Sequence, residues 1–184
     1  TGPIESLAGN MAQGAELAME EINSAGGILD GDMLVPVRAD TGCIDNGLAT
    51  SNAERLIAEG VKGIVGGDCS GVTGAILQNV ARANGMVMIS PSATSPALST
   101  AEDDDLFFRT APTDAREGEV MAEILKERGI ESIALTYTNN DYGKGLADAI
   151  ESSFKAAGGE VTIVAAHEDG RGDYSSEVAA LAAA

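Results

Sequence analysis

The sequence is poor in aromatic and basic residues and has no tryptophan. Aromatic residues make up 3% of the 184 residues, so a core must be built from Val, Ile, Leu, Ala and Met. The chain carries 11 basic and 29 acidic residues, a formal net charge of -18. Nucleic acids and anionic membrane surfaces repel such a protein, so we exclude both as partners. No apolar run approaches the length of a membrane span, and no membrane insertion is expected.

Motifs of catalysis and of metal binding are also missing. The stretch GGDCSG (66–71) has no lysine after it and is not a P-loop, and no G-x-S-x-G nucleophile elbow is found. His167 is the only histidine, and Cys69 has no evident base that would activate it as a nucleophile. No enzyme activity, cofactor or metal site is therefore predicted. The acidic run 102–105 indicates a solvated loop, with a cation site as the alternative.

Apolar spacing predicts a regular alternation of helices and strands. Helical spacing is found at 10–25, and strands are predicted where short apolar runs end in turn residues. The first series has helices at 10–25, 45–60 and 71–85 and strands at 33–40, 61–67, 86–90 and 106–112. The second has helices at 115–129, 143–159 and from 174 onward, with strands at 132–138 and 160–168. This alternation is typical of α/β folds with mainly parallel sheets and helices on both faces.

The alternation breaks once, which predicts two lobes. The strand at 106–112 follows a loop instead of a helix, and a fresh series begins after it. We expect a first lobe at 1–112 and a second at 113–184. A doubly wound lobe normally opens with its central strand, and none precedes the first helix. We therefore expect a longer protein in which the first strand and much of the second lobe lie outside these residues.

Small polar residues follow three of the predicted strands. Ser70 comes after the strand at 61–67, and Ser92 and Thr94 follow the strand at 86–90 between two prolines. Tyr142 comes after the strand at 132–138. Ligands of α/β proteins bind at the carboxyl ends of strands, and hydroxyl and backbone N–H groups can hold a carboxylate or phosphate there. An N-cap serine, an ordinary turn and a helix-start tyrosine are the alternative interpretations.

The order and spacing of several motifs resemble one known family. The motifs are TGP (1–3), GAELAMEEINSAGGI (14–28), DTGC (40–43), GGDCSGVT (66–73), MISPSATSP (88–96), FFRTAPTDA (107–115) and NDYGKGLA (140–147). Together they resemble the periplasmic solute-binding proteins of branched-chain amino acid ABC transporters, the Leu/Ile/Val-binding type. The resemblance implies the type I periplasmic binding protein fold, whose two lobes close on a small solute without performing chemistry.

The resemblance also implies roles for individual residues. Ser70 matches a serine that receives the ligand α-carboxylate, and Thr94 matches a threonine that contacts both carboxylate and ammonium. The backbone carbonyl of Ser92 would accept the ammonium, and Ala93 lies between these two positions. Tyr142 matches a tyrosine that covers the ligand. Leu7 stands where some relatives have a tryptophan at the mouth of the pocket, and the family's acidic ammonium partner would fall beyond Ala184.

The two cysteines, taken alone, could be free thiols or a pair. The resemblance implies a disulfide between Cys43 and Cys69, and with it an oxidising compartment, the periplasm. It also implies a monomeric receptor that binds a branched-chain amino acid by default and delivers it to the membrane permease of an ABC transporter. The alternative is a domain of the same fold that reports amino acids or amides to a signalling partner.

Overall fold

The computed structural model describes residues 2–184 and divides into two compact units. Unit 1 comprises Thr1–Ala93 and Glu102–Thr110, and unit 2 comprises Thr94–Ala101 and Ala111–Ala184. The chain therefore crosses between the units at Ala93 and Thr94, inside one of the predicted strand-end loops. The lobe bounds 1–112 and 113–184 stay a prediction.

Unit 1 is built on a parallel sheet of three short strands. The strands are β1 (Ile64–Val65), β2 (Met88–Ser90) and β3 (Phe107–Arg109), in the order β1-β2-β3. Ile64 is paired with Met88, and Met88 with Phe107. Because all three strands run in the same direction, their carboxyl ends meet at one edge of the sheet. This edge carries the loops that contain Ser70 and Ser92.

Helices of unit 1 follow the predicted apolar pattern. They are α1 (Glu5–Ser24), α2 (Asn46–Ala58) and α3 (Ser70–Ile76), which continues through the π-helical turn η1 (Leu77–Ala81) into α4 (Arg82–Asn84). The run from Ser70 to Asn84 ends at Gly85, whose φ of 60° lies in the left-handed region that favours glycine. The side chains of Val72, Leu77 and Val80 are fully buried and form the core beside the sheet.

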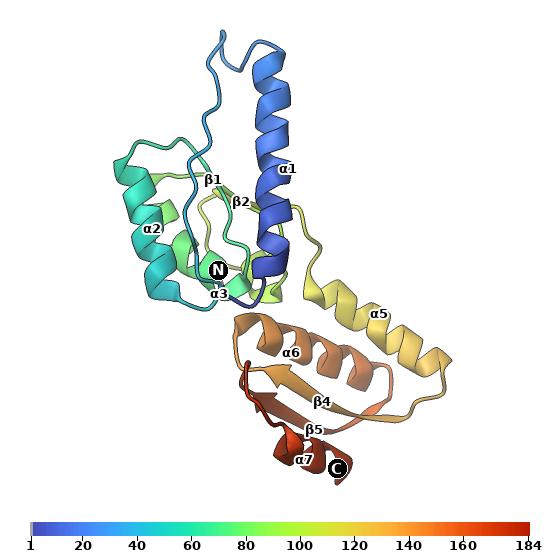
Figure 1. Ribbon diagram of the computed structural model, residues 1–184. Helices are drawn as coiled ribbons and strands as arrows, with labels where there is room; N and C mark the ends of the chain where they lie inside the picture. The colour runs from blue at the N-terminus through green and yellow to red at the C-terminus, as the bar shows by residue number, and fades with distance from the viewer. Residues whose placement is uncertain (1) are drawn as a thin grey trace. The chain divides into compact units, whose positions relative to one another are not determined.

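The predicted strand at 33–40 is wrong. This segment is extended but joins no sheet, and it runs beside α1 (Figure 1). The amide of Asn23 takes the place of a strand partner, since it donates to the Leu34 carbonyl at 2.8 Å and accepts the Leu34 N–H at 2.7 Å. Arg38 forms a two-pronged ion pair with Glu16 of α1. Pro36 has no N–H to contribute to a ladder, which also disfavours strand pairing.

The acidic run at 102–105 is folded against the helix that ends at Asn84. Arg82 binds Asp104 with its Nε at 2.8 Å and Glu102 with a terminal nitrogen at 3.3 Å. The Gln78 amide donates to the Glu102 carbonyl at 2.7 Å. An arginine thus neutralises part of this loop, and no group of acids, histidines or cysteines in residues 2–184 is arranged to hold a metal ion.

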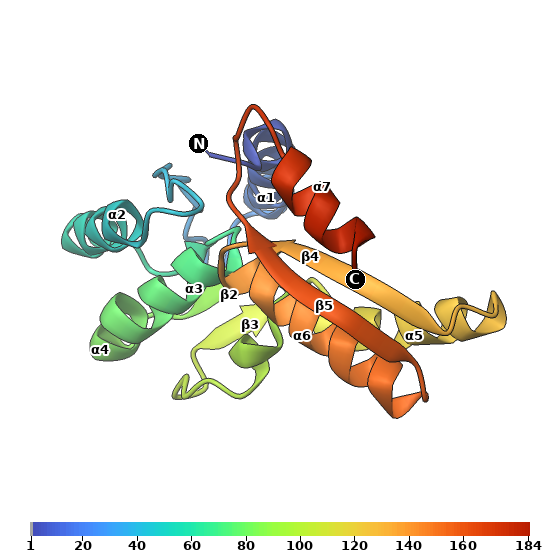
Figure 2. The ribbon, with the colours of Figure 1, turned by 90° about the horizontal axis from the view of Figure 1, so that it is seen from below.

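Unit 2 has a two-stranded parallel sheet with helices on both faces. Its elements are η2 (Pro96–Ser99), α5 (Asp114–Glu127), β4 (Ser132–Thr138), α6 (Asp141–Ala156), β5 (Glu160–His167) and α7 (Ser175–Ala182). Helix α6 packs on one face of β4 and β5 and α7 on the other, while α5 packs on α6 (Figures 1 and 2). Phe154 is fully buried, and α5 approaches α6 closely at Gly118, where a Cβ would lie 2.6 Å from the backbone of Ala149.

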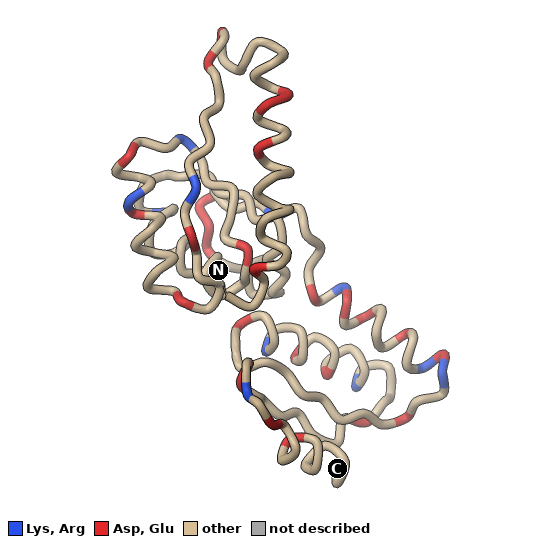
Figure 3. The backbone as a smooth tube through the Cα atoms, in the orientation of Figure 1, with Lys and Arg blue, Asp and Glu red and all other residues tan. Residues whose placement is uncertain are grey.

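Acidic and basic residues are spread along the backbone of both units (Figure 3). Most basic side chains form ion pairs with acids on the same or a neighbouring element, as Lys144 does with Asp148 and Lys155 with Glu151. Such exposed pairs contribute about 0–1 kcal/mol each. In the described part of the chain no helix combines the length and apolarity needed to cross a membrane.

Candidate functional site

Two strand-end loops of unit 1 are joined by hydrogen bonds from serine side chains. The loop after β1 (66–69) leads to Ser70, and the loop after β2 contains Ser92. The Ser90 hydroxyl donates to the Gly67 carbonyl at 2.5 Å, and the Ser92 hydroxyl donates to the Asp68 carbonyl at 2.6 Å. The structure therefore brings Ser92 beside the loop that carries Ser70, as expected for neighbouring parallel strands.

Ser70 is buried and is the first residue of α3. The N-cap residue is Cys69, whose side chain makes no capping hydrogen bond. Thr73 holds the turn from within, because its hydroxyl bonds the carbonyls of Gly67 at 2.9 Å and Cys69 at 2.8 Å. Ser70 is therefore not the plain N-cap residue of the alternative interpretation. Its hydroxyl and backbone N–H stand at the start of the helix, where an anion is favoured.

The segment Ser92–Thr94 contains both hydrogen-bond donors and hydrogen-bond acceptors. The Ala93 N–H donates to the Ser90 hydroxyl at 3.0 Å, and the Ala93 carbonyl accepts from Arg109 at 3.2 Å. The Ser92 carbonyl, in contrast, accepts no hydrogen bond from residues 2–184. Ala93 is 1% exposed, so this backbone is held in place by burial as well as by hydrogen bonds.

The hydroxyl of Thr94 is buried and unpartnered within the described residues. The Thr94 carbonyl accepts the N–H of Asp114, the first residue of α5, at 3.0 Å, so the Thr94 backbone is anchored in unit 2. A buried hydroxyl without a hydrogen bond costs about 1–3 kcal/mol. A buried hydroxyl of this kind is open to a hydrogen bond from a bound water or ligand.

The disulfide that the resemblance implied is present. Cys43 and Cys69 are bonded, with Cα atoms 5.2 Å apart and a sequence separation of 26 residues. The bond ties the turn at 40–43 to the residue just before Ser70. That turn is itself ordered, because the Asp40 side chain accepts the Gly42 N–H at 2.9 Å and Asn52 donates to the Asp40 carbonyl at 2.8 Å.

Tyr142 lies in the first turn of α6, directly after β4. Asn140 caps this helix by accepting the Gly143 N–H at 2.8 Å. A Cβ at Gly143 would collide with the backbone of Thr138, so only glycine lets the helix start this close to the strand end. Tyr142 is 44% exposed. Its pKa is raised by partial burial and then by the negative charges of Asp114 and Glu117.

Leu7 lies near the start of α1, and its side chain is 58% exposed. Unit 1 thus holds Leu7, Ser70, Ser92 and Ala93, and unit 2 holds Thr94 and Tyr142. Within unit 1 a hydrogen bond joins Ser92 to the loop before Ser70, and among the described residues Leu7 forms no hydrogen bond with Ser70 or Ser92. The assignment of these residues to a ligand site stays a prediction.

Sequence reasoning missed Asp68, which lies two positions before Ser70. Its carboxylate is half-buried, and in residues 2–184 it has neither a hydrogen bond nor an ion pair. Burial raises the pKa of this carboxyl above its ordinary value. The aspartate is visible in the stretch GGDCSG, but its lack of a partner becomes apparent only in three dimensions.

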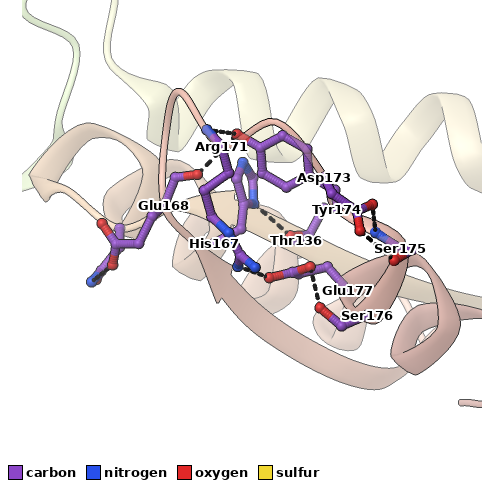
Figure 4. A network of polar contacts seen from close by, with 10 residues as sticks. Thr136, His167, Glu168, Arg171, Asp173, Tyr174, Ser175, Ser176 and Glu177 are labelled. Carbon is purple, nitrogen blue, oxygen red and sulfur yellow. Dashed lines mark hydrogen bonds and ion pairs between the residues drawn. The ribbon is translucent and has the colours of Figure 1, made fainter.

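His167 belongs to a polar network at the carboxyl end of β5 (Figure 4). Its Nδ1 shares a 2.7 Å hydrogen bond with the Thr136 hydroxyl, and its ring packs edge-on against Tyr174. The Tyr174 hydroxyl donates to the Glu168 carbonyl at 2.9 Å, and Arg171 lies over the tyrosine ring and pairs with Glu177. These contacts hold the loop between β5 and α7 in place, and His167 is part of them.

The fold matches solved structures of one class of receptors, the type I periplasmic binding proteins. The branched-chain amino acid substrate-binding protein LivJ of Streptococcus pneumoniae, solved with isoleucine, matches with a TM-score of 0.81 and 29% identity, over 100% of this chain and 51% of that one. The leucine-binding protein LivK of Thermotoga maritima matches with a TM-score of 0.88 and 25% identity, over 100% of this chain and 51% of that one.

The family model described as periplasmic binding protein matches residues 1–184, and the chain belongs to that family. It is 35% identical to Leu/Ile/Val-binding protein homolog 3 of Brucella melitensis, over 100% of this chain and 49% of the relative. It is 34% identical to the Leu/Ile/Val/Thr-binding protein of Salmonella typhimurium, over 98% of this chain and 49% of the relative. The chain spans about half the length of the curated relatives it matches.

Proposed function

We propose that the protein is an extracytoplasmic receptor that captures a free α-amino acid and delivers it to the membrane permease of an ABC transporter. Family membership and the relatives named for binding leucine, isoleucine, valine and threonine support a solute-binding role. The Cys43–Cys69 disulfide supports an oxidising compartment such as the periplasm. The receptor is proposed to act as a monomer, with lobes at 1–112 and 113–184, and without a cofactor.

The observation that carries the proposal is the buried hydroxyl of Thr94, near in sequence to the Ser92 carbonyl; neither group has a hydrogen-bond partner within residues 2–184. A zwitterionic amino acid head presents a carboxylate, which accepts hydrogen bonds, and an ammonium, which donates them. The Ser70 hydroxyl and N–H and the Thr94 hydroxyl are proposed to bind the carboxylate. The Ser92 carbonyl and the Thr94 oxygen are proposed to bind the ammonium.

Neutral donors suffice for this head group because hydrogen bonds to charged groups contribute about 1.5–3 kcal/mol each. Ala93 has no polar side chain and leaves its neighbours room at the head group. Tyr142 is proposed to cover the bound ligand with its ring and to donate a hydrogen bond from its hydroxyl. Leu7 is proposed to contact the ligand side chain.

The proposal is tested by calorimetric titration of the full-length protein with amino acids, using Ser70→Ala and Thr94→Val. Each variant removes one hydroxyl, and loss of a hydrogen bond to a charged group predicts affinity weaker by roughly 10- to 150-fold. Thr162→Val is the matched control, since Thr162 is an exposed residue of β5 outside the proposed site. Unchanged affinity in both site variants would refute the assignment.

A further inference from the structure

Asp68 differs from the other acids around the strand-end loops in having no hydrogen bond or ion pair within residues 2–184; the positive charge of the amino terminus lowers its pKa by less than burial raises it. The Asp45 side chain caps α2 by accepting the Leu48 N–H at 2.9 Å, and the Asp40 side chain accepts the Gly42 N–H. Asp104 and Glu16 pair with arginines. For the Asp68 carboxylate, residues 2–184 provide neither a donor nor a cation, although it is half-buried.

The position of Asp68 is fixed by the same contacts that shape the proposed head-group site. Its carbonyl accepts the Ser92 hydroxyl at 2.6 Å, and the carbonyls on either side of it, of Gly67 and Cys69, both accept the Thr73 hydroxyl. The next residue is bound to Cys43 by the disulfide, and Ser70 follows. These contacts fix the backbone of the loop at Asp68.

A partly buried carboxylate without a hydrogen bond from residues 2–184 is unfavourable in the free protein. Desolvation disfavours its charged form, and this is the largest cause of the raised pKa of Asp68. A ligand group that donates a hydrogen bond removes this penalty, because an ionised carboxylate has only acceptor sites. An aliphatic ligand side chain would instead increase the desolvation and leave the carboxylate unpaired.

We propose that Asp68 determines ligand specificity by binding a hydrogen-bond donor on the side chain of the amino acid. The ligand class is therefore α-amino acids whose side chains carry a hydroxyl, amide, ammonium or guanidinium group. The inference rests on the proposed function, since it assigns a side-chain contact to the same site. A site built to bond a polar group rejects an analogue that lacks it, because its own polar group is left unpaired.

The test uses pairs of amino acids that have similar shapes and differ in the donor: threonine against valine, and lysine against norleucine. Affinities are measured by calorimetry on the full-length protein. The wild type is expected to bind at least one donor ligand about 10-fold or more tightly than its apolar twin. Asp68→Leu is expected to abolish or reverse that preference, and Asp68→Asn, which keeps the shape, to weaken a cationic ligand more than a neutral one.

Asp30→Asn is the matched control, because Asp30 is exposed and lies in the turn after α1. It is expected to leave every affinity unchanged. The inference is overturned if the wild type binds the apolar twins as tightly as the donor ligands, or if Asp68→Leu weakens both members of each pair equally. In either case the amino acid receptor stands. Binding of no amino acid overturns the proposed function and this inference together.

Discussion

Removing the disulfide tests how the Ser70 loop is held. The change is the double variant Cys43→Ala/Cys69→Ala, which leaves no thiol that could form another bond. With a separation of 26 residues, loop-closure entropy gives a stabilisation of about 3.5 kcal/mol at 25 °C. We expect unit 1 to lose most of this stabilisation. It should stay folded, because the hydrogen bonds of the turn at 40–43 remain.

The assay is denaturant unfolding of the full-length protein with and without a thiol reductant, followed by ligand titration. Reductant should destabilise the wild type by about the amount that the double variant loses, and should leave the variant unaffected. Ligand affinity should fall in the variant, because the residue before Ser70 is no longer anchored to Cys43. A loss below about 1 kcal/mol with unchanged affinity would refute the reasoning that the disulfide holds this loop.

Two further predictions concern packing and pH. Gly118→Ala should destabilise unit 2 by about 1–3 kcal/mol in unfolding experiments, because its Cβ would lie 2.6 Å from the backbone of Ala149. Gly14→Ala on α1 is the control, since the new Cβ would have no atom within 4 Å, and it should stabilise the protein by about 0.5–1 kcal/mol. Equal effects of the two would contradict the close approach of α5 to α6. Asp68→Asn should stabilise the ligand-free protein at neutral pH. The raised pKa means that the folded state binds the proton more tightly, so the wild type loses stability as pH rises through that pKa, and melting curves of variant and wild type should converge as pH falls below the ordinary value of 3.8.

The periodic elements were predictable from the sequence because their causes are local. The strand predicted at 132–138 is β4 (Ser132–Thr138), and the helix predicted at 71–85 is found from Ser70 to Asn84. In both cases apolar spacing and a following glycine or polar turn agree with the packing. The segment 33–40 has an apolar pattern too, but a strand needs a neighbour, and Asn23 supplies hydrogen bonds in place of one.

The candidate site was only partly predictable. Strand ends pointed to Ser70, Ser92 and Thr94, because parallel strands bring their carboxyl ends together. The pairing of the cysteines came from the resemblance to a family, since spacing alone left free thiols open. Asp68 was missed because the chemistry of an acid depends on its burial and its partners, and both are properties of the folded loop.

The decisive measurement is calorimetric titration of the full-length protein with an amino acid, the corresponding carboxylic acid without the amine, and the corresponding amine without the carboxylate. The account predicts that the amino acid binds and that each truncated analogue binds at least about 10-fold more weakly, because Ser70 and Thr94 hold one charge and the Ser92 carbonyl the other. Equal binding of the amine-free acid would contradict recognition of the ammonium, and binding of none of the three would contradict an amino acid receptor.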